Sequence, residues 1–129
     1  MYNNYDWGGY LIWRLAPERK VFIDGRGFDD VFLWQAMKIR VAHVIKGTGE
    51  REWRSLLQKY GVTYIITTSQ APQGRVDDLV RALLSDAEWV PVYFHKASHS
   101  LIFVNNTPEY AQVISKYAIN REALFRALL

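Results

Sequence analysis

The residues whose types and spacing could support chemistry lie near the N-terminus. Asp24 and Arg26 flank a single glycine directly after the apolar run 21–23. An arginine in this position could hold a phosphate or a carboxylate in a bidentate fork, and the glycine would let the backbone approach such a ligand. Ligands of α/β proteins favour the crevice outside the strand ends. Asp24 and Arg26 are therefore candidate ligand-binding residues, and Asp24 could also act as a base or bind a metal.

Asp6 and Trp7 form a second candidate pair, in a segment rich in aromatic rings. Asp6 could serve as a base or bind a metal. The rings around it could stack on sugars or rest at a membrane interface, where tryptophan and tyrosine are enriched. The rings of this cluster are Tyr2, Tyr5, Trp7, Tyr10 and Trp13. We name Asp6 and Trp7 as further candidate ligand-binding residues.

Each of these features also has a structural interpretation, which we favour for the Asp24 turn. In such turns the aspartate commonly accepts backbone hydrogen bonds and the arginine pairs with it. Gly8 and Gly9 are more often a close-packing point or a bulge than a phosphate cradle. Their spacing matches neither a P-loop nor a dinucleotide fingerprint. The aromatic rings could equally plug one end of the core, because large rings are usually well buried.

Other catalytic and metal-binding chemistries find little support. His95 and His99 flank a three-residue loop, but no acidic residue lies between positions 89 and 108 to complete a metal site. The serines lack a Gly-x-Ser-x-Gly elbow. The chain has no cysteine, which excludes thiol catalysis, thiolate metal sites and disulfides. We therefore expect no metal and no cofactor.

Composition places the chain among ordinary globular proteins. Half of its 129 residues are hydrophobic and 22% are charged, which is enough apolar material for one folded domain. The formal net charge is +3, but the basic residues are spread among 13 acids rather than gathered in a stripe. A nucleic-acid partner is therefore not expected. No stretch of about 20 apolar residues occurs, so nothing in this sequence should span a bilayer.

Hydrophobic periodicity predicts the elements that position the candidate residues. Apolar runs predict five strands, at 10–13, 21–23, 62–68, 89–95 and 99–104. Apolar residues at helical spacing predict helices that open at Asp29, after Gly49, at Val76, at Thr107 and at Asn120. In the first of these helices, Leu33, Met37, Val41 and Val44 should share the inner face, widened by Trp34.

The order of these elements predicts an α/β fold built as a single soluble domain over residues 1–129. We expect a mixed, partly parallel sheet of about five strands with helices packed on it. The unit from strand 62–68 through a helix to strand 89–95 is the best candidate for a parallel crossover. The fold should end in an antiparallel hairpin, because only three residues join the last two strands, followed by C-terminal helices.

Two segments carry a resemblance to a known family. The segment NYDWGGYLIWRL, followed by VFIDGR, resembles the start of the soluble C-terminal domain of bacterial multi-pass membrane proteins of the GT-C glycosyltransferase type. Their later Tyr-Gly-Val strand and Trp-x-x-Val-Tyr hairpin are similar to residues 60–66 and 89–104. The resemblance covers roughly residues 3–105 and leaves out the helical tail.

The resemblance implies an extracytoplasmic domain at a bacterial inner membrane, cut from a longer chain. Its partner would be the membrane-embedded remainder of the same polypeptide, with a glycan or lipid-linked sugar as a further candidate. In such transferases the catalytic acid sits in a membrane-proximal loop outside this sequence. The Trp-Trp-Asp motif of oligosaccharyltransferases is missing, since Asp6-Trp7 stands alone. The resemblance therefore implies an accessory, non-catalytic role for this domain in a parent protein that is itself a glycosyltransferase.

Two alternatives remain open at this point. The chain could be a stand-alone enzyme that binds an anionic small molecule through Asp24 and Arg26. It could also be a basic module that binds a protein or a nucleic acid, in which case nucleic-acid binding would weaken steeply with added salt.

Overall fold

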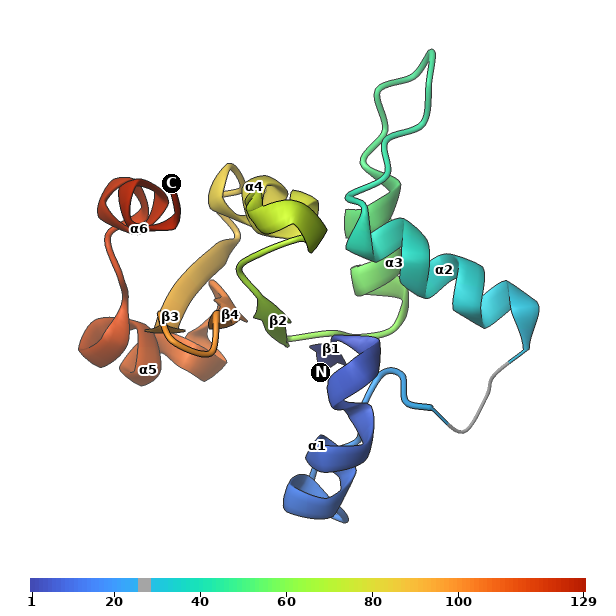
Figure 1. Ribbon diagram of the computed structural model, residues 1–129, viewed down its shortest axis with the longest axis horizontal. Coiled ribbons are helices and arrows are strands. Elements are labelled where there is room, and N and C mark those ends of the chain that lie inside the picture. The colour runs from blue at the N-terminus through green and yellow to red at the C-terminus, as the bar shows by residue number, and fades with distance from the viewer. Residues whose placement is uncertain (26–28) are drawn as a thin grey trace. The chain divides into compact units, whose positions relative to one another are not determined.

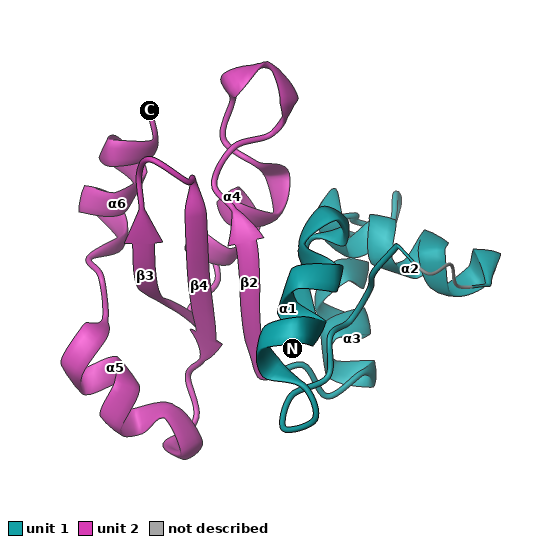
Figure 2. Ribbon diagram, turned by 60° about the horizontal axis from the view of Figure 1, so that its bottom comes forward, with its two compact units in different colours: residues 1–62 teal, residues 63–129 magenta. Residues whose placement is uncertain are grey.

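The computed structural model describes residues 1–25 and 29–129, so the candidate Arg26 lies outside the described residues. It confirms the α/β class, since helices and strands both recur along the chain (Figure 1). The chain divides into two compact units, residues 1–62 and 63–129 (Figure 2). Within the described ranges, no helix is both long enough and apolar enough to cross a bilayer.

Unit 1 is mostly helical. Its elements are β1 (Tyr2–Asn3), the 3₁₀ turn η1 (Tyr5–Trp7), α1 (Gly8–Leu15), α2 (Asp30–Arg40) and α3 (Glu52–Lys59). The helix predicted to open at Asp29 is confirmed, because the Asp29 carboxylate accepts a hydrogen bond from the Phe32 backbone N–H at 2.9 Å. Gly61 ends α3 as predicted, with a φ of 59° that glycine adopts without strain.

Two of the five predicted strands are wrong. Residues 10–13 belong to α1, where Leu11 packs inward while Tyr10 and Trp13 face outward. A four-residue apolar run is too short to distinguish a strand from a buried helix turn. Residues 21–23 form no strand because the Asn3 side chain, rather than a neighbouring strand, bonds to their backbone. The described residues therefore hold four strands, β1 to β4, and not five.

The inner face of α2 is also different from the predicted one. Ala36 and Ile39 are buried, whereas the four residues expected to face inward are exposed, and two of them, Val41 and Val44, lie beyond the last residue of α2. Trp34 was expected to widen the inner face, yet it is 68% exposed. The sequence could not reveal this, because α2 carries apolar residues around much of its circumference.

Unit 2 contains the remaining strands and helices of the described residues. Its elements are β2 (Tyr64–Thr68), η2 (Pro72–Gly74), α4 (Asp78–Leu84), β3 (Trp89–His95), β4 (Ser100–Asn105), η3 (Pro108–Tyr110), α5 (Ala111–Tyr117) and α6 (Arg121–Leu128). These match the elements predicted for this part of the chain, including the helix start at Thr107 and Pro108. The Asn120 side chain caps α6 by accepting from Ala123 N–H at 2.9 Å.

The sheet of unit 2 has β4 at its centre. β4 pairs antiparallel with β2, from Tyr64 opposite Val104 to Thr68 opposite Ser100. It also pairs antiparallel with β3, which confirms the predicted hairpin. β2 and β3 therefore run in the same direction, as the predicted crossover requires, but β4 lies between them. The short hairpin loop places β4 next to β3, and β4 also pairs with β2.

The core of unit 2 lies between this sheet and α4. Ile65, Leu101 and Phe103 come from the strands and are fully buried. Leu79 and Leu83 come from α4, at the i, i+4 spacing that places both side chains on one helix face. Both α4 and α5 contact β3. The apolar face predicted for this helix from the sequence is therefore the face of α4 that packs into the core.

Arg121 joins the ends of several elements in unit 2, a role that no sequence pattern predicts. Its guanidinium donates to the carbonyl oxygens of Leu84 and Asp86, both at 2.9 Å, and to the Trp89 carbonyl. The Leu84 carbonyl belongs to the last turn of α4, where helical C=O groups lack intrahelical N–H donors, and the Asp86 carbonyl follows that turn. Arg121 therefore fixes the start of α6 to the segment between α4 and β3.

Candidate functional site

The Asn3 side chain forms a hydrogen-bonded clamp on the segment that precedes Asp24. Its Oδ1 accepts from the Phe22 backbone N–H at 2.7 Å, and its Nδ2 donates to the Ile23 carbonyl at 2.8 Å. Asn3 is completely buried, and Phe22 and Ile23 are buried with it. Because buried backbone groups need partners, this one side chain replaces a strand pairing along two residues.

Gly8 allows the same segment to approach α1 closely. A Cβ atom at position 8 would lie 2.2 Å from the Ile23 carbonyl oxygen and 2.5 Å from the Asp24 Cβ. Only glycine fits at such a distance. Gly9, the next residue, has open space around it and could carry a side chain. The interpretation of the double glycine as a close-packing point is therefore confirmed for Gly8.

Asp24 lies at the bottom of a hollow beside α1. It is 1% exposed and is engaged in an interaction within the protein. The hollow has a volume of about 370 Å³, and its rim includes Arg19 and Lys20. Asp24 thus contributes to the packing of unit 1, and the two cations near it were not singled out from the sequence.

Asp6 and Trp7 lie in η1, on a different hollow from Asp24. Asp6 is exposed and makes no hydrogen bond or ion pair with any described residue. It lies on the rim of a hollow of about 310 Å³ whose lining includes Tyr5, Leu33 and Met37. Trp7 is half-buried and directly precedes the first residue of α1. The structure therefore does not gather the described candidates into one site.

The aromatic cluster of the N-terminus is divided between the core and the surface. Tyr2 is buried and packs on Phe22 with ring centroids 5.2 Å apart, as the core interpretation predicted. Tyr5, Tyr10 and Trp13 are exposed, in line with the alternative that they contact something outside the domain. Of these rings, only Tyr10 and Trp13 belong to α1, and both lie on its exposed side, away from the buried Leu11.

A charge cluster joins α2 to α3. The Glu52 carboxylate accepts from Lys38 Nζ at 2.9 Å and lies 2.7 Å from Nδ1 of His43. The Lys38 hydrogen bond is the largest cause that lowers the pKa of Glu52 below its ordinary value, and His43 adds to it. Burial acts in the opposite direction and is outweighed. His43 is thus a surface residue whose ring is oriented by Glu52.

This cluster predicts how the stability of unit 1 depends on pH. An acid whose folded pKa is lowered stabilises the fold above its unfolded pKa, and this stabilisation is lost as the pH falls through the folded pKa. Glu52→Gln should therefore lower the denaturation midpoint at pH 7, and the difference from wild type should shrink below about pH 4.3. Urea unfolding of both proteins across this range measures it. Glu50→Gln is the matched control, since Glu50 has only a 3.5 Å contact with Ser55; an equal effect would contradict the assignment.

The histidines beside the β3–β4 loop make contacts within that loop. His95 Nδ1 lies 2.8 Å from the Ser98 hydroxyl, and His99 adopts a φ of 53° in the turn. Among residues 1–25 and 29–129, no three histidine, aspartate or glutamate side chains are placed to hold a metal ion. These residues serve the geometry of the hairpin loop.

Comparison of the chain with family models, with curated proteins and with solved structures finds no match. The surfaces that a ligand or a partner could use are those of the fold itself. Unit 1 has two hollows, one lined by aromatic rings together with Asp6 and Arg40, and one with Arg19 and Lys20 on its rim. It also offers exposed apolar side chains on α1 and α2.

Proposed function

We propose that this chain is a non-catalytic accessory domain on the extracytoplasmic face of a bacterial inner membrane, within a glycosyltransferase-like membrane protein. Its partner is the membrane-embedded remainder of the same polypeptide. The observation that carries the proposal is the apolar surface of unit 1. Most of the large apolar side chains that are exposed among the described residues lie in residues 1–62.

Helix α2 supplies the largest part of this surface. Val31 and Trp34 are 67% and 68% exposed, and they lie three residues apart on one side of the helix. Leu33 and Met37 extend the apolar surface around the helix toward the hollow beside Tyr5. Contiguous exposed apolar patches on globular proteins commonly mark interfaces with proteins or membranes. A membrane-embedded partner in the same polypeptide would cover such a surface permanently.

The polar residues of the N-terminal motif support the accessory role. The Asn3 side chain is hydrogen-bonded to backbone groups of the same unit, and Asp24 is buried. Gly8 packs closely against the segment that contains Asp24. Each therefore shapes unit 1 rather than facing a substrate. The chemistry of the parent protein is then assigned to its membrane-proximal loops, as the resemblance implies. A glycan or lipid-linked sugar is a further candidate ligand, for which Tyr5 and Asp6 offer a ring and a carboxylate on one hollow.

Fractionation of cells that produce the complete native gene product tests this proposal. The protein should stay in the membrane pellet after carbonate extraction, and protease added to intact spheroplasts should cleave it within unit 1 or unit 2. Release by carbonate, or protection from protease until the spheroplasts are lysed, would contradict the anchoring or the sidedness respectively.

A further inference from the structure

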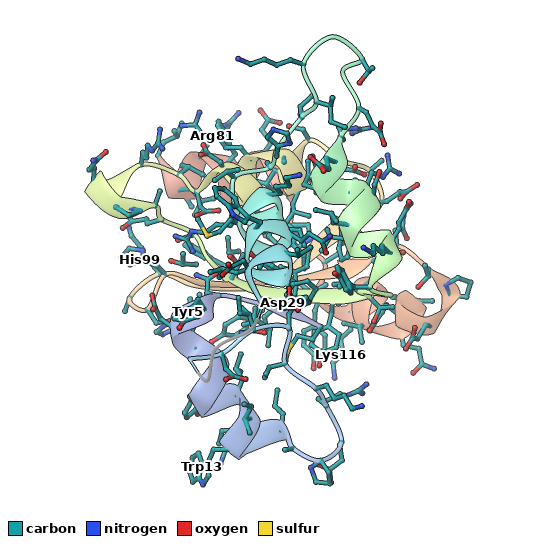
Figure 3. The ribbon with its side chains drawn as sticks, turned by 90° about the vertical axis from the view of Figure 1, so that its right-hand side faces the viewer. Tyr5, Trp13, Asp29, Arg81, His99 and Lys116 are labelled. Carbon is teal, nitrogen blue, oxygen red and sulfur yellow. The ribbon has the colours of Figure 1, made fainter. Side chains whose placement is uncertain are left out.

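Helix α1 has two faces with different tasks. Leu11 is buried against the rest of unit 1. On the opposite side, Tyr10 and Trp13 are 62% and 75% exposed, with ring centroids 6.0 Å apart. The Arg14 guanidinium lies 5.6 Å from the Trp13 ring centroid. Figure 3 shows Trp13 at the outer end of α1, directed away from the ribbon. Two adjacent rings and a cation therefore point into solvent together.

Further cations follow α1 directly. Arg19 and Lys20 are exposed and line the hollow of about 370 Å³ that also borders Pro17. The only acidic side chain between residues 10 and 20 is Glu18. Asp24, at the base of the hollow, is buried and already engaged. The rim of the hollow therefore carries two cations, and it is bordered by Ile12 of α1, the residue before Trp13.

We propose that this surface, made by Tyr10, Trp13, Arg14, Arg19 and Lys20 and here called the α1 surface, binds an anionic phospholipid bilayer. Tyrosine and tryptophan prefer the headgroup level of a membrane, where an apolar ring body and a polar edge are both satisfied. Arginine and lysine beside them are attracted to the negative lipid surface. The hollow at Lys20 then accepts a lipid phosphate. The inference rests on the proposed function, which places the domain beside a membrane.

The composition of the α1 surface favours lipid over a protein partner. Lysine is depleted in the cores of protein interfaces, which are low in charge. Interfacial membrane contacts instead combine aromatic rings with arginine and lysine. At eight residues, α1 is about 12 Å long, which suits lying in the headgroup layer and is far too short to cross it.

Vesicle co-sedimentation of the 129-residue chain tests the proposal. The wild-type chain should pellet with phosphatidylcholine vesicles that contain phosphatidylglycerol, and binding should fall with added salt. Tyr10→Ala with Trp13→Ala should weaken binding at least about tenfold, because two interfacial rings are lost. Arg14→Gln combined with Lys20→Gln should lower the affinity for these vesicles about fivefold per removed cation. It should change the affinity for vesicles of phosphatidylcholine alone very little. Arg19 is left in place because it has a partner within the protein.

Trp34→Ala is the matched control, since Trp34 is exposed to a similar degree but lies on α2. It should leave vesicle binding unchanged. All variants should keep the wild-type circular dichroism and thermal midpoint, which separates a lost contact from a lost fold. Failure of the wild-type chain to pellet, or an equal loss in Trp34→Ala, would overturn the proposal. Tight binding of inorganic phosphate that competes with vesicles would reassign the hollow to a free anion and also overturn it.

These outcomes are separate from those of cell fractionation. Vesicle binding is measured on the chain itself, whereas carbonate extraction reports on the complete gene product. A chain that binds vesicles in a parent protein without membrane anchoring would sink the proposed function and leave the α1 surface intact.

Discussion

Replacing Asn3 by alanine is expected to destabilise unit 1 by about 4 kcal/mol. The substitution leaves the Phe22 N–H and the Ile23 carbonyl buried without partners, and each unsatisfied backbone group costs about 1–3 kcal/mol. Urea unfolding followed by circular dichroism measures the change. The loss is large because one completely buried side chain serves backbone groups on both sides of a peptide unit.

Asn3→Asp is the informative companion to this variant. Aspartate keeps the oxygen that accepts from Phe22 N–H but cannot donate to the Ile23 carbonyl, and its charge would be buried. It should therefore be at least as destabilising as alanine at pH 7 and should recover part of the loss at acidic pH, where the carboxyl group is protonated. A near-neutral Asn3→Ala would contradict the clamp.

Replacing Gly8 by alanine is expected to destabilise unit 1 by about 3 kcal/mol, the upper end of the usual cost of overpacking. The new methyl group would meet the Ile23 carbonyl oxygen and the Asp24 Cβ well inside contact distance. Both obstacles belong to a segment held in place by Asn3, so they cannot move aside without breaking its hydrogen bonds. Denaturant unfolding gives the difference from wild type.

Gly9→Ala provides a control one residue away. Gly9 lies in the same helix, but nothing occupies the space around it. Alanine there should be neutral or stabilise by about 0.5 kcal/mol, because glycine costs helices backbone entropy. Opposite signs for the two adjacent glycines would establish the close approach at position 8. Similar losses at both positions would show instead that α1 tolerates no added side chain.

Unit 2 could be predicted from the sequence because its signals are local. The β-branched run of β2, the short loop between β3 and β4, and the i, i+4 leucines of α4 each specify their element within about ten residues. The position of β4 between β2 and β3 was not predicted, because strand order depends on pairing across the chain. Arg121 was missed for the same reason, since its carbonyl partners lie more than 30 residues away.

Unit 1 was harder to predict because its contacts are long-range and its helices are apolar on more than one side. Asn3 replaces a strand partner for residues near position 22, which no periodicity reveals. The outward faces of α1 and α2 carry large apolar residues of the kind usually found in a core. Trp34 was therefore predicted to face inward, although it is exposed. An inner face is predictable only when the opposite face is polar.

The candidate site was foreseen in part. The sequence drew attention to Asp24, and the structural interpretation of its turn agrees with its burial. Asp6 and Asp24 lie on separate hollows. No sequence motif marks the other residues that line these hollows, namely Arg19, Lys20 and the residues of α2. Sequence spacing alone could not show which side chains converge.

Sequencing the gene upstream of the codon for Tyr2 tests the central claim most directly. The accessory-domain account predicts that this region encodes several apolar segments of about 20 residues each, long enough to span a bilayer. A native gene that encodes no such segments would contradict the account and make Asp24 and Arg26 the first residues to test by ligand titration.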